Sequence, residues 1–366
     1  MSASFTLAKL AQEINATLEG DGTVAVKRLV HPAAYQSPAE LVLAMDDKLL
    51  PLLQGKAVSA AVVSVKAPRE TAQHLLRVTR PRLALSRLTN LFAQLPDFGA
   101  GVHSSAVVDA TAKLGKHVVI GPHCTVGAGA VIGDRCVLQS NVIVEAGAII
   151  GADTVLRAGV CIGAACAIGA RCLLHFNCSI GSDGFSFVTA EKGSVEAAKS
   201  DGSVTATNTQ GWLRIASLGA VIIGDDVEIG ANTSIDRGTI VDTRIGRGTK
   251  IDNQVQIGHN VQIGEDCLLC GRVGLAGSVE LGNRVVIGGA SGLADHVKVG
   301  DDAVIMSMSG VGTHVPARQV YGGAPAIPRE RAVEQHLAIN RLKSLVNRVD
   351  NLDASVKALE QKAESR

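Results

Sequence analysis

In and around the stretch Ile251-Asp-Asn-Gln-Val-Gln-Ile-Gly-His-Asn-Val261, aliphatic residues recur at every sixth position. A period of six fits neither the 3.6-residue turn of an α-helix nor the two-residue alternation of a simple strand. The same period covers residues 102–180 without a slip and resumes over residues 223–235. After a phase shift across residues 236–244, it continues over residues 245–311. A repeat sustained over this length predicts a solenoid.

Each hexad predicts one short strand and one corner of a parallel β-helix. The aliphatic residue points inward, and a glycine often follows it, which we expect to let the backbone turn. The fifth position is small or β-branched, as in Val118, Cys124, Ala130, Cys136, Val255, Val261, Cys267 and Val273. No single coil could bury its inner face alone, so the coils must stack.

The cysteines follow the same register. Six of the eight occupy the inward fifth position: Cys124, Cys136, Cys166, Cys172, Cys178 and Cys267. Cys267-Leu-Leu-Cys270 resembles half of a zinc site, but no second pair lies at ligand spacing. We therefore expect these thiols to be core residues and expect no metal site.

Composition excludes several functional classes. The 366 residues include 35 Lys plus Arg and 34 Asp plus Glu, so the overall charge does not favour nucleic acid. The N-terminal residues lack the basic, apolar and small-residue segments of a signal peptide. No apolar run is long enough for a transmembrane segment. A soluble cytoplasmic protein is expected.

The flanks of the solenoid lack the hexads. Residues 1–100 predict a separate α/β domain, with helices over Leu7–Ile14 and Pro81–Phe92 and a buried strand over residues 57–65. Residues 101–320 form the solenoid, interrupted by an insertion at about residues 185–218. Its polar stretch, residues 189–210, predicts an exposed loop. The single tryptophan, Trp212, is expected either to contact a ligand or to anchor this loop.

Residues 321–366 predict a C-terminal helical segment. Apolar residues alternate there at spacings of three and four: Leu342, Leu345, Val349, Leu352, Val356 and Leu359. This apolar seam is too short for an independent coiled coil. It favours a small bundle between chains that are already assembled over packing of the helix on its own chain.

His259 is the residue that most suggests chemistry. It is third in its hexad and should face outward, with Gly277 three hexads further on. His296 lies 37 residues beyond His259; if three hexads make one coil, it is roughly 10 Å away along the same edge, for neighbouring strands about 4.8 Å apart. The alternatives are a solvated surface histidine and a metal ligand. The absence of a third ligand at suitable spacing argues against a metal.

Several motifs resemble the UDP-3-O-acylglucosamine N-acyltransferase family of lipid A biosynthesis. They are Ser182-Asp-Gly-Phe-Ser-Phe187, Ile235-Asp-Arg-Gly-Thr239, the stretch Ile251–Val261, Ala276-Gly-Ser278 and Gly288-Gly-Ala-Ser-Gly-Leu-Ala-Asp-His296. The resemblance extends over nearly the whole chain. It implies a mainly β fold: a left-handed parallel β-helix with an N-terminal α/β domain and a C-terminal α-helical extension.

The resemblance also implies an activity. A 3-hydroxyacyl chain would move from acyl carrier protein to the 2-amino group of UDP-3-O-acylglucosamine. His259 matches the family's general base, the Gly277 N–H its oxyanion donor, and His296 a supporting histidine. Three further positions, Asp252, Asn253 and Gln256, match the groove for the donor's phosphopantetheine arm. No permanently bound cofactor is implied, and the family assembles as a homotrimer.

One departure concerns uridine, which the family holds in its N-terminal domain between aromatic side chains. The matching positions here are Leu43 and Leu49, which cannot stack on a base as rings do, while Lys48 remains for a phosphate. Either uridine is held by apolar contact, or the chain is a paralogue that acylates another nucleotide-linked amino sugar. A non-catalytic structural β-helix is the third alternative. The acyl chain length does not follow from the sequence.

Overall fold

The computed structural model describes residues 4–93, 98–191, 193, 197–198, 202, 211–323 and 326–364. The chain divides into two compact units, Met1–Asp97 and Phe98–Arg366. Neither contains, among the described residues, a helix long and apolar enough to cross a membrane.

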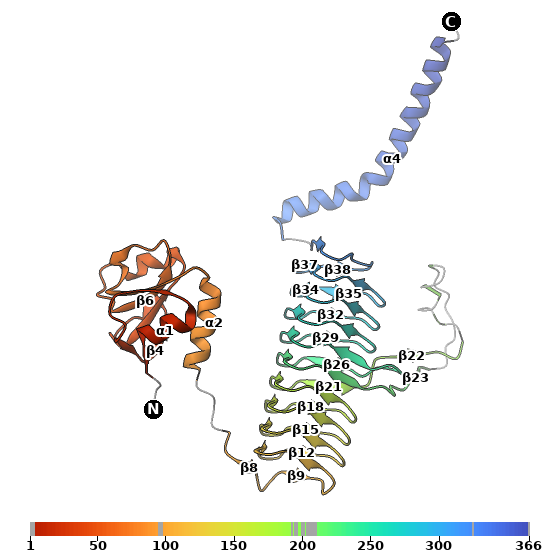
Figure 1. The fold of residues 1–366 in the computed structure, drawn as a ribbon. Helices are drawn as coiled ribbons and strands as arrows, with labels where there is room; N and C mark the ends of the chain where they lie inside the picture. The colour runs from red at the N-terminus through yellow and green to blue at the C-terminus, as the bar shows by residue number, and fades with distance from the viewer. Residues whose placement is uncertain are drawn as a thin grey trace. The chain divides into compact units, whose positions relative to one another are not determined.

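The first unit is an α/β domain with a five-stranded mixed sheet in the order β2-β7-β6-β5-β4 (Figure 1). Its elements are β1 (Phe5–Thr6), α1 (Leu7–Ile14), β2 (Thr17–Glu19), β3 (Ala25–Val26), β4 (Arg28–Val30), η1 (Pro32–Ala34), β5 (Glu40–Ala44), η2 (Asp47–Leu53), β6 (Ala60–Ser64), η3 (Arg69–Thr71), β7 (His74–Val78) and α2 (Pro81–Phe92). Both predicted helices and the buried strand are confirmed. Alternate residues of β5 enter different cores: Leu41 packs with α1 and α2, and Val42 packs against Leu53 of η2 on the other face.

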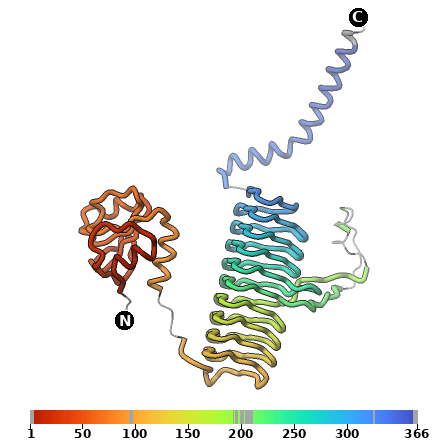
Figure 2. Tube along the Cα trace, viewed as in Figure 1, coloured from red at the N-terminus to blue at the C-terminus, as the bar shows by residue number. Residues whose placement is uncertain are grey.

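The second unit is a parallel β-helix with three faces, as the hexads predict. Figure 2 shows its coils stacked in one column. Face 1 consists of β8 (Gly101–Val102), β11 (Val119–Ile120), β14 (Val137–Leu138), β17 (Val155–Leu156), β20 (Leu173–Leu174), β25 (Glu228–Ile229), β28 (Lys250–Ile251), β31 (Leu268–Leu269), β34 (Val286–Ile287), β37 (Val304–Ile305) and β39 (Val320–Tyr321).

Face 2 follows face 1 in every coil, and face 3 completes the turn. Face 2 consists of β9 (Val107–Val108), β12 (Thr125–Val126), β15 (Ile143–Val144), β18 (Cys161–Ile162), β21 (Ser179–Ser182), β26 (Ser234–Asp236), β29 (Gln256–Ile257), β32 (Gly274–Leu275), β35 (Gly292–Leu293) and β38 (Gly310–Val311). Face 3 consists of β10 (Lys113–Leu114), β13 (Val131–Ile132), β16 (Ile149–Ile150), β19 (Ala167–Ile168), β24 (Val221–Ile223), β27 (Thr243–Ile245), β30 (Gln262–Ile263), β33 (Glu280–Leu281) and β36 (Lys298–Val299).

Hexad residues fill the core as expected. The aliphatic residues are buried from Ile120 onward, and so are the six cysteines of the fifth position. Five of the thiols donate to backbone carbonyls at the corner of the next coil, as Cys178 Sγ does to Gly230 O at 3.0 Å; they are those of Cys124, Cys136, Cys172, Cys178 and Cys267. Burial raises the pKa of the Cys178 thiol to about 11. These side chains therefore pack the interior and satisfy corner carbonyls at the same time.

The predicted role of the glycine that follows the aliphatic residue is wrong in one respect. Gly121 does not have a left-handed backbone; the left-handed residue is His123, two positions later, with φ 57°. A Cβ on Gly121 would instead lie 3.0 Å from the carbonyl carbon of Gln139 in the next coil. Glycine there eases the close approach of the next coil, and the turn is made two residues later.

Two irregularities break the stack. An insertion separates β21 from β24 and includes the antiparallel pair β22 (Phe187–Val188) and β23 (Leu213–Arg214), which projects from the coils in Figure 1. Most of the loop predicted over residues 189–210 lies outside the described residues. Trp212 is 65% exposed and does not anchor the insertion on the coils. The second irregularity is the enlarged corner between β26 and β27, where the hexad phase shifts.

The predicted C-terminal helix is confirmed as α4 (Arg329–Glu364). The side chains of its apolar seam are about half exposed or more, from 49% at Val356 to 66% at Leu359. The seam is therefore not packed on its own chain.

Candidate active site

The candidate site lies at the corner between faces 2 and 3, where β29 ends at Ile257 and the chain turns through His259. The Ser278 N–H in the next coil donates to His259 O at 2.9 Å, so Gly277 stacks directly beside His259, as the 18-residue spacing predicts. A Cβ on Gly277 would lie 2.7 Å from His259 Cε1 and 2.9 Å from Nε2. The imidazole ring therefore lies against the backbone of Gly277, and a side chain there would displace it.

The insertion holds the other side of His259. Gly184 follows the start of the insertion, and a Cβ built on it would lie 2.8 Å from His259 Cβ and 3.0 Å from Cδ2. Its N–H donates to Ser217 Oγ at 3.0 Å, which ties the outgoing strand of the insertion to the returning one. His259 is thus contacted at its base by a glycine of the insertion and at its ring tip by a glycine of the next coil.

Asn260 determines which imidazole nitrogen of His259 carries the proton. The Asn260 Oδ1 accepts from the Thr239 N–H at 3.2 Å, and Nδ2 donates to Val241 O at 2.8 Å. These backbone groups fix the orientation of the amide, because the Thr239 N–H can only donate and the Val241 carbonyl can only accept. The Asn260 Oδ1 also lies 2.9 Å from His259 Nδ1, which must therefore be the protonated nitrogen. In the neutral ring, Nε2 is therefore the nitrogen that has the lone pair and can accept a proton.

The Gly277 N–H is available to a ligand. At the same hexad position of the same corner, the Ala164 N–H donates to Glu145 Oε2 at 2.8 Å. Of the hydrogen bonds made by the described residues, none engages the Gly277 N–H. A free backbone donor beside an unprotonated imidazole nitrogen is an arrangement suited to acyl transfer.

Asp236 contributes a carboxylate to this corner. Its Oδ1 accepts from Ser182 Oγ at 2.9 Å, and its Oδ2 accepts from Gln256 Nε2 at 3.4 Å. Burial raises the pKa of the Asp236 carboxyl; the hydrogen bonds from Ser182 and Gln256 and the charge of His259 oppose this rise, and Asp183 adds to it.

The enlarged corner is stiffened by Arg237 and Gly238. Arg237 donates from Nε to Gly181 O at 2.9 Å and from Nη2 to Ala164 O at 2.7 Å, reaching across two neighbouring coils. A Cβ on Gly238 would collide with Val241 O. Both residues hold the backbone that orients Asn260.

The other predicted site residues lie apart from this cluster. Asp252 and Asn253 occupy the preceding corner, between faces 1 and 2, where Asn253 Oδ1 accepts from the Ala231 N–H at 2.6 Å. His296 is exposed, and its N–H donates to Gly277 O at 3.1 Å, two coils along the corner from His259. Gln256 joins the cluster through Asp236.

Asp236, Asn260 and Ser182 were not predicted as site residues, although the quoted motifs contain Asp236 and Ser182, and the opening stretch contains Asn260. The available signal was the phase shift over residues 236–244, which marks the corner that carries them. Within the described residues, no cluster of three or more His, Cys, Asp or Glu side chains could hold a metal ion.

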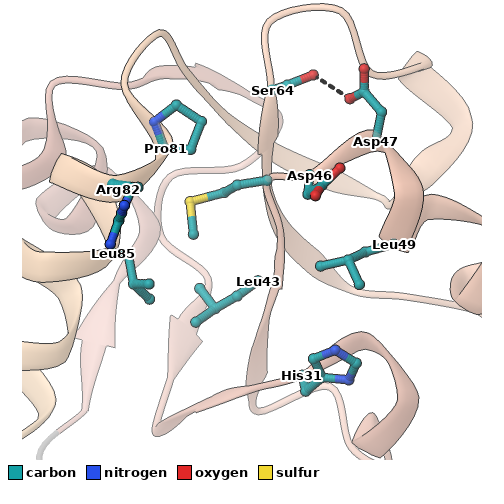
Figure 3. A pocket seen from close by; sticks show the side chains of 10 residues that line it. His31, Leu43, Asp46, Asp47, Leu49, Ser64, Pro81, Arg82 and Leu85 are labelled. Carbon is teal, nitrogen blue, oxygen red and sulfur yellow. Dashed lines mark hydrogen bonds between the residues drawn. The ribbon is translucent and has the colours of Figure 1, made fainter. Parts of the chain in front are cut away.

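The N-terminal unit has its own cavity of about 700 Å³ (Figure 3). Leu43, Leu49 and Leu85 line it, with Arg82 beside Leu85 at one edge and His31 at another. The remaining lining residues are Met45, Asp46, Asp47, Ser64 and Pro81. Lys48 is exposed and lies outside this lining, so Arg82 is the strong cation of the cavity.

Comparison with known proteins identifies the family. The model of the bacterial transferase hexapeptide (six repeats) matches residues 111–146, 129–164 and 242–277, and that of the hexapeptide repeat of succinyl-transferase matches residues 220–258. The UDP-3-O-acylglucosamine N-acyltransferase of Ruegeria pomeroyi is 48% identical over 356 residues, which cover 96% of this chain and 98% of the relative. The chain belongs to the UDP-3-O-acylglucosamine N-acyltransferase family.

A second relative agrees with this assignment. The UDP-3-O-acylglucosamine N-acyltransferase of Paracoccus denitrificans is 49% identical over 279 residues, or 75% of each chain. A crystal structure of UDP-N-acetylglucosamine O-acyltransferase from Moraxella catarrhalis matches with a TM-score of 0.46 and 26% identity, covering 64% of this chain and 77% of that one. The predicted family is confirmed, and the protein is an acyltransferase.

Proposed function

We propose that the chain transfers a 3-hydroxyacyl group from acyl carrier protein to the 2-amino group of UDP-3-O-acylglucosamine, a step of lipid A biosynthesis. The proposal rests chiefly on the site at His259, where the Asn260 contact makes Nε2 the proton acceptor of the neutral ring and no described residue engages the Gly277 N–H. The names of the relatives support the identity of the acceptor.

The proposed reaction forms one amide bond. The acceptor nitrogen attacks the thioester carbonyl carbon, and His259 Nε2 takes the proton that the nitrogen loses. The Gly277 N–H stabilises the negative charge that develops on the carbonyl oxygen. When the C–S bond breaks, the imidazolium returns the proton to the departing sulfur, so the carrier leaves as a free thiol. The N–H at Nδ1, bonded to Asn260, stays in place throughout.

The proposed roles of the remaining residues are binding roles. Asp252, Asn253 and Gln256 are proposed to line the path of the phosphopantetheine arm, which arrives on the donor, and His296 to support substrate placement. Uridine is proposed to bind in the N-terminal cavity against Leu43 and Leu49, with Lys48 near a phosphate.

The decisive experiment is turnover of an acyl carrier protein thioester with a panel of UDP-linked amino sugars. Amide formation on UDP-3-O-acylglucosamine in preference to the other acceptors is the expected result. The leucine walls of the N-terminal cavity favour a second candidate, an enzyme for another nucleotide-linked amino sugar. Preference for such an acceptor would select that candidate, and no turnover with any acceptor would support a structural β-helix.

We also propose that the active form is a homotrimer. The half-exposed seam of α4 and the exposed apolar residues of the coils, such as Ile149 at 50%, support burial between copies of the chain. Sedimentation in dilute solution should give the mass of three chains. A monomeric mass would rule the trimer out.

A further inference from the structure

Asp236 is the one carboxylate of the candidate site without a cationic partner among the described lysines and arginines. Asp183, on the insertion, pairs with Arg214 at 3.5 Å, and Asp242, in the enlarged corner, pairs with Arg244 at 2.8 Å. The guanidinium adjacent to Asp236, that of Arg237, is turned away to the carbonyls of neighbouring coils. A partly buried carboxylate with two neutral donors is incompletely compensated.

The lone pairs of Asp236 leave room for a further donor. Each oxygen accepts one hydrogen bond, from Ser182 Oγ or Gln256 Nε2, and a carboxylate oxygen can accept two. The pairing of β26 with β29 aligns Ile235 with Ile257, which places Asp236 across from Gly258, the residue before the base. A cationic group bound by Asp236 would therefore be close to the nitrogen that takes its proton.

We infer that Asp236 recognises the acceptor's amine in its protonated, ammonium form and presents it to His259. The inference rests on the proposed function and adds a specificity residue to it. An amine flanked by electron-withdrawing oxygens has a pKa near that of an α-amino group, about 7.7–8.0, so most of it carries a proton at neutral pH. A hydroxyl acceptor carries no such charge, and Asp236 would favour nitrogen over oxygen as the nucleophile.

The Asp236 carboxylate stabilises the positive charge both before and after the proton transfer. Before the transfer the positive charge lies on the ammonium group, and afterwards it lies on the His259 imidazolium, while Asp236 stays ionised. One positive charge faces one negative charge in each state, so the transfer does not leave the carboxylate unpaired. The imidazolium passes this first proton to solvent, and the neutral amine then attacks the thioester while Nε2 takes its second proton, as in the proposed reaction.

Calorimetric binding of the amine acceptor and of its amide product tests the inference. In Asp236→Asn, one neutral polar group replaces the carboxylate while hydrogen bonding to Ser182 and Gln256 remains possible. The affinity for the amine acceptor should fall roughly 10–100-fold, the usual worth of a hydrogen bond to a charged group. Affinity for the amide product, which has no ammonium group, should stay within about twofold because it lacks that charge-assisted contact.

Asp242→Asn is the matched control, since it removes a carboxylate of the same corner that already has an arginine partner. It should bind both ligands as the wild type does. Equal weakening of both ligands by Asp236→Asn, or no weakening of either, would overturn the inference. Failure of the wild type to bind or acylate the amine acceptor would instead contradict the proposed function. The two failures are therefore separable.

Discussion

Replacement of Gly277 by alanine tests the placement of the catalytic histidine. The new Cβ would lie 2.7 Å from His259 Cε1, about 0.8 Å closer than the roughly 3.5 Å at which carbon atoms make optimal contact. Gly184 limits how far the ring can retreat, because it packs against the Cβ and Cδ2 atoms of the same side chain. A displacement of about 1 Å at a reacting group typically costs about 10²-fold in rate, so kcat should fall by about that factor.

Alanine itself is compatible with the backbone at this position, because Gly277 lies outside the left-handed region. The Tm should therefore change little, and the N–H of residue 277 remains as a donor. Gly312→Ala is the matched control: it lies two coils further along the same corner, and a Cβ there meets nothing within 4 Å. Steady-state kinetics with a carrier-linked donor and a thermal melt measure both variants. Turnover of Gly277→Ala within about threefold of the wild type would refute the steric argument, which requires a loss near 10²-fold.

Three further outcomes are expected. His259→Ala should lose about 10²–10⁴-fold in turnover with little change in Tm, and His296→Ala should lose less turnover. Equal and negligible losses of turnover in steady-state assays would remove both histidines from the mechanism. Burial raises the pKa of Cys178 to about 11, whereas an unfolded thiol ionises near about 8.5, so the unfolded state binds fewer protons between these values. The free energy of unfolding, measured with denaturant, should consequently fall as pH rises above about 8.5, and a Cys178→Val variant should show a smaller fall. Reversal of Arg341 and Lys343 on α4 to glutamate should weaken use of the acidic carrier-linked donor and flatten its salt dependence, but spare a free pantetheine thioester. Equal loss with both donors would assign these charges to folding or assembly.

The β-helix could be predicted from sequence because every hexad makes the same contribution to it. Ile120 pairs with Leu138 one coil later, and the same relation holds wherever the period holds. The period also predicts which side chains are buried, including the cysteines of the fifth position. It could not assign the function of the glycines, since close approach of the next coil at Gly121 depends on how tightly the coils stack.

Half of the candidate site could be predicted in the same way. The contact of His259 with Gly277 follows from a spacing of one coil. The contacts of Asn260 and Asp236 could not be predicted, because they depend on backbone that leaves the period: Thr239 and Val241 in the enlarged corner, and Ser182 at the start of the insertion. Their positions are set by tertiary packing rather than by repeat number.

The two breaks in the period converge on one corner, and this explains why the chemistry lies there. In a regular coil the left-handed corner residue bonds to its equivalent in the next coil, as Arg135 does to Asp153 at 2.6 Å. Asn260 occupies the same kind of position, but the additional residues of the enlarged corner give it backbone partners, Thr239 and Val241, within its reach. It can therefore hold the His259 ring instead of joining a surface ladder. A deletion that restored the hexad phase over residues 236–244 would keep the stack and lose the orientation of the base.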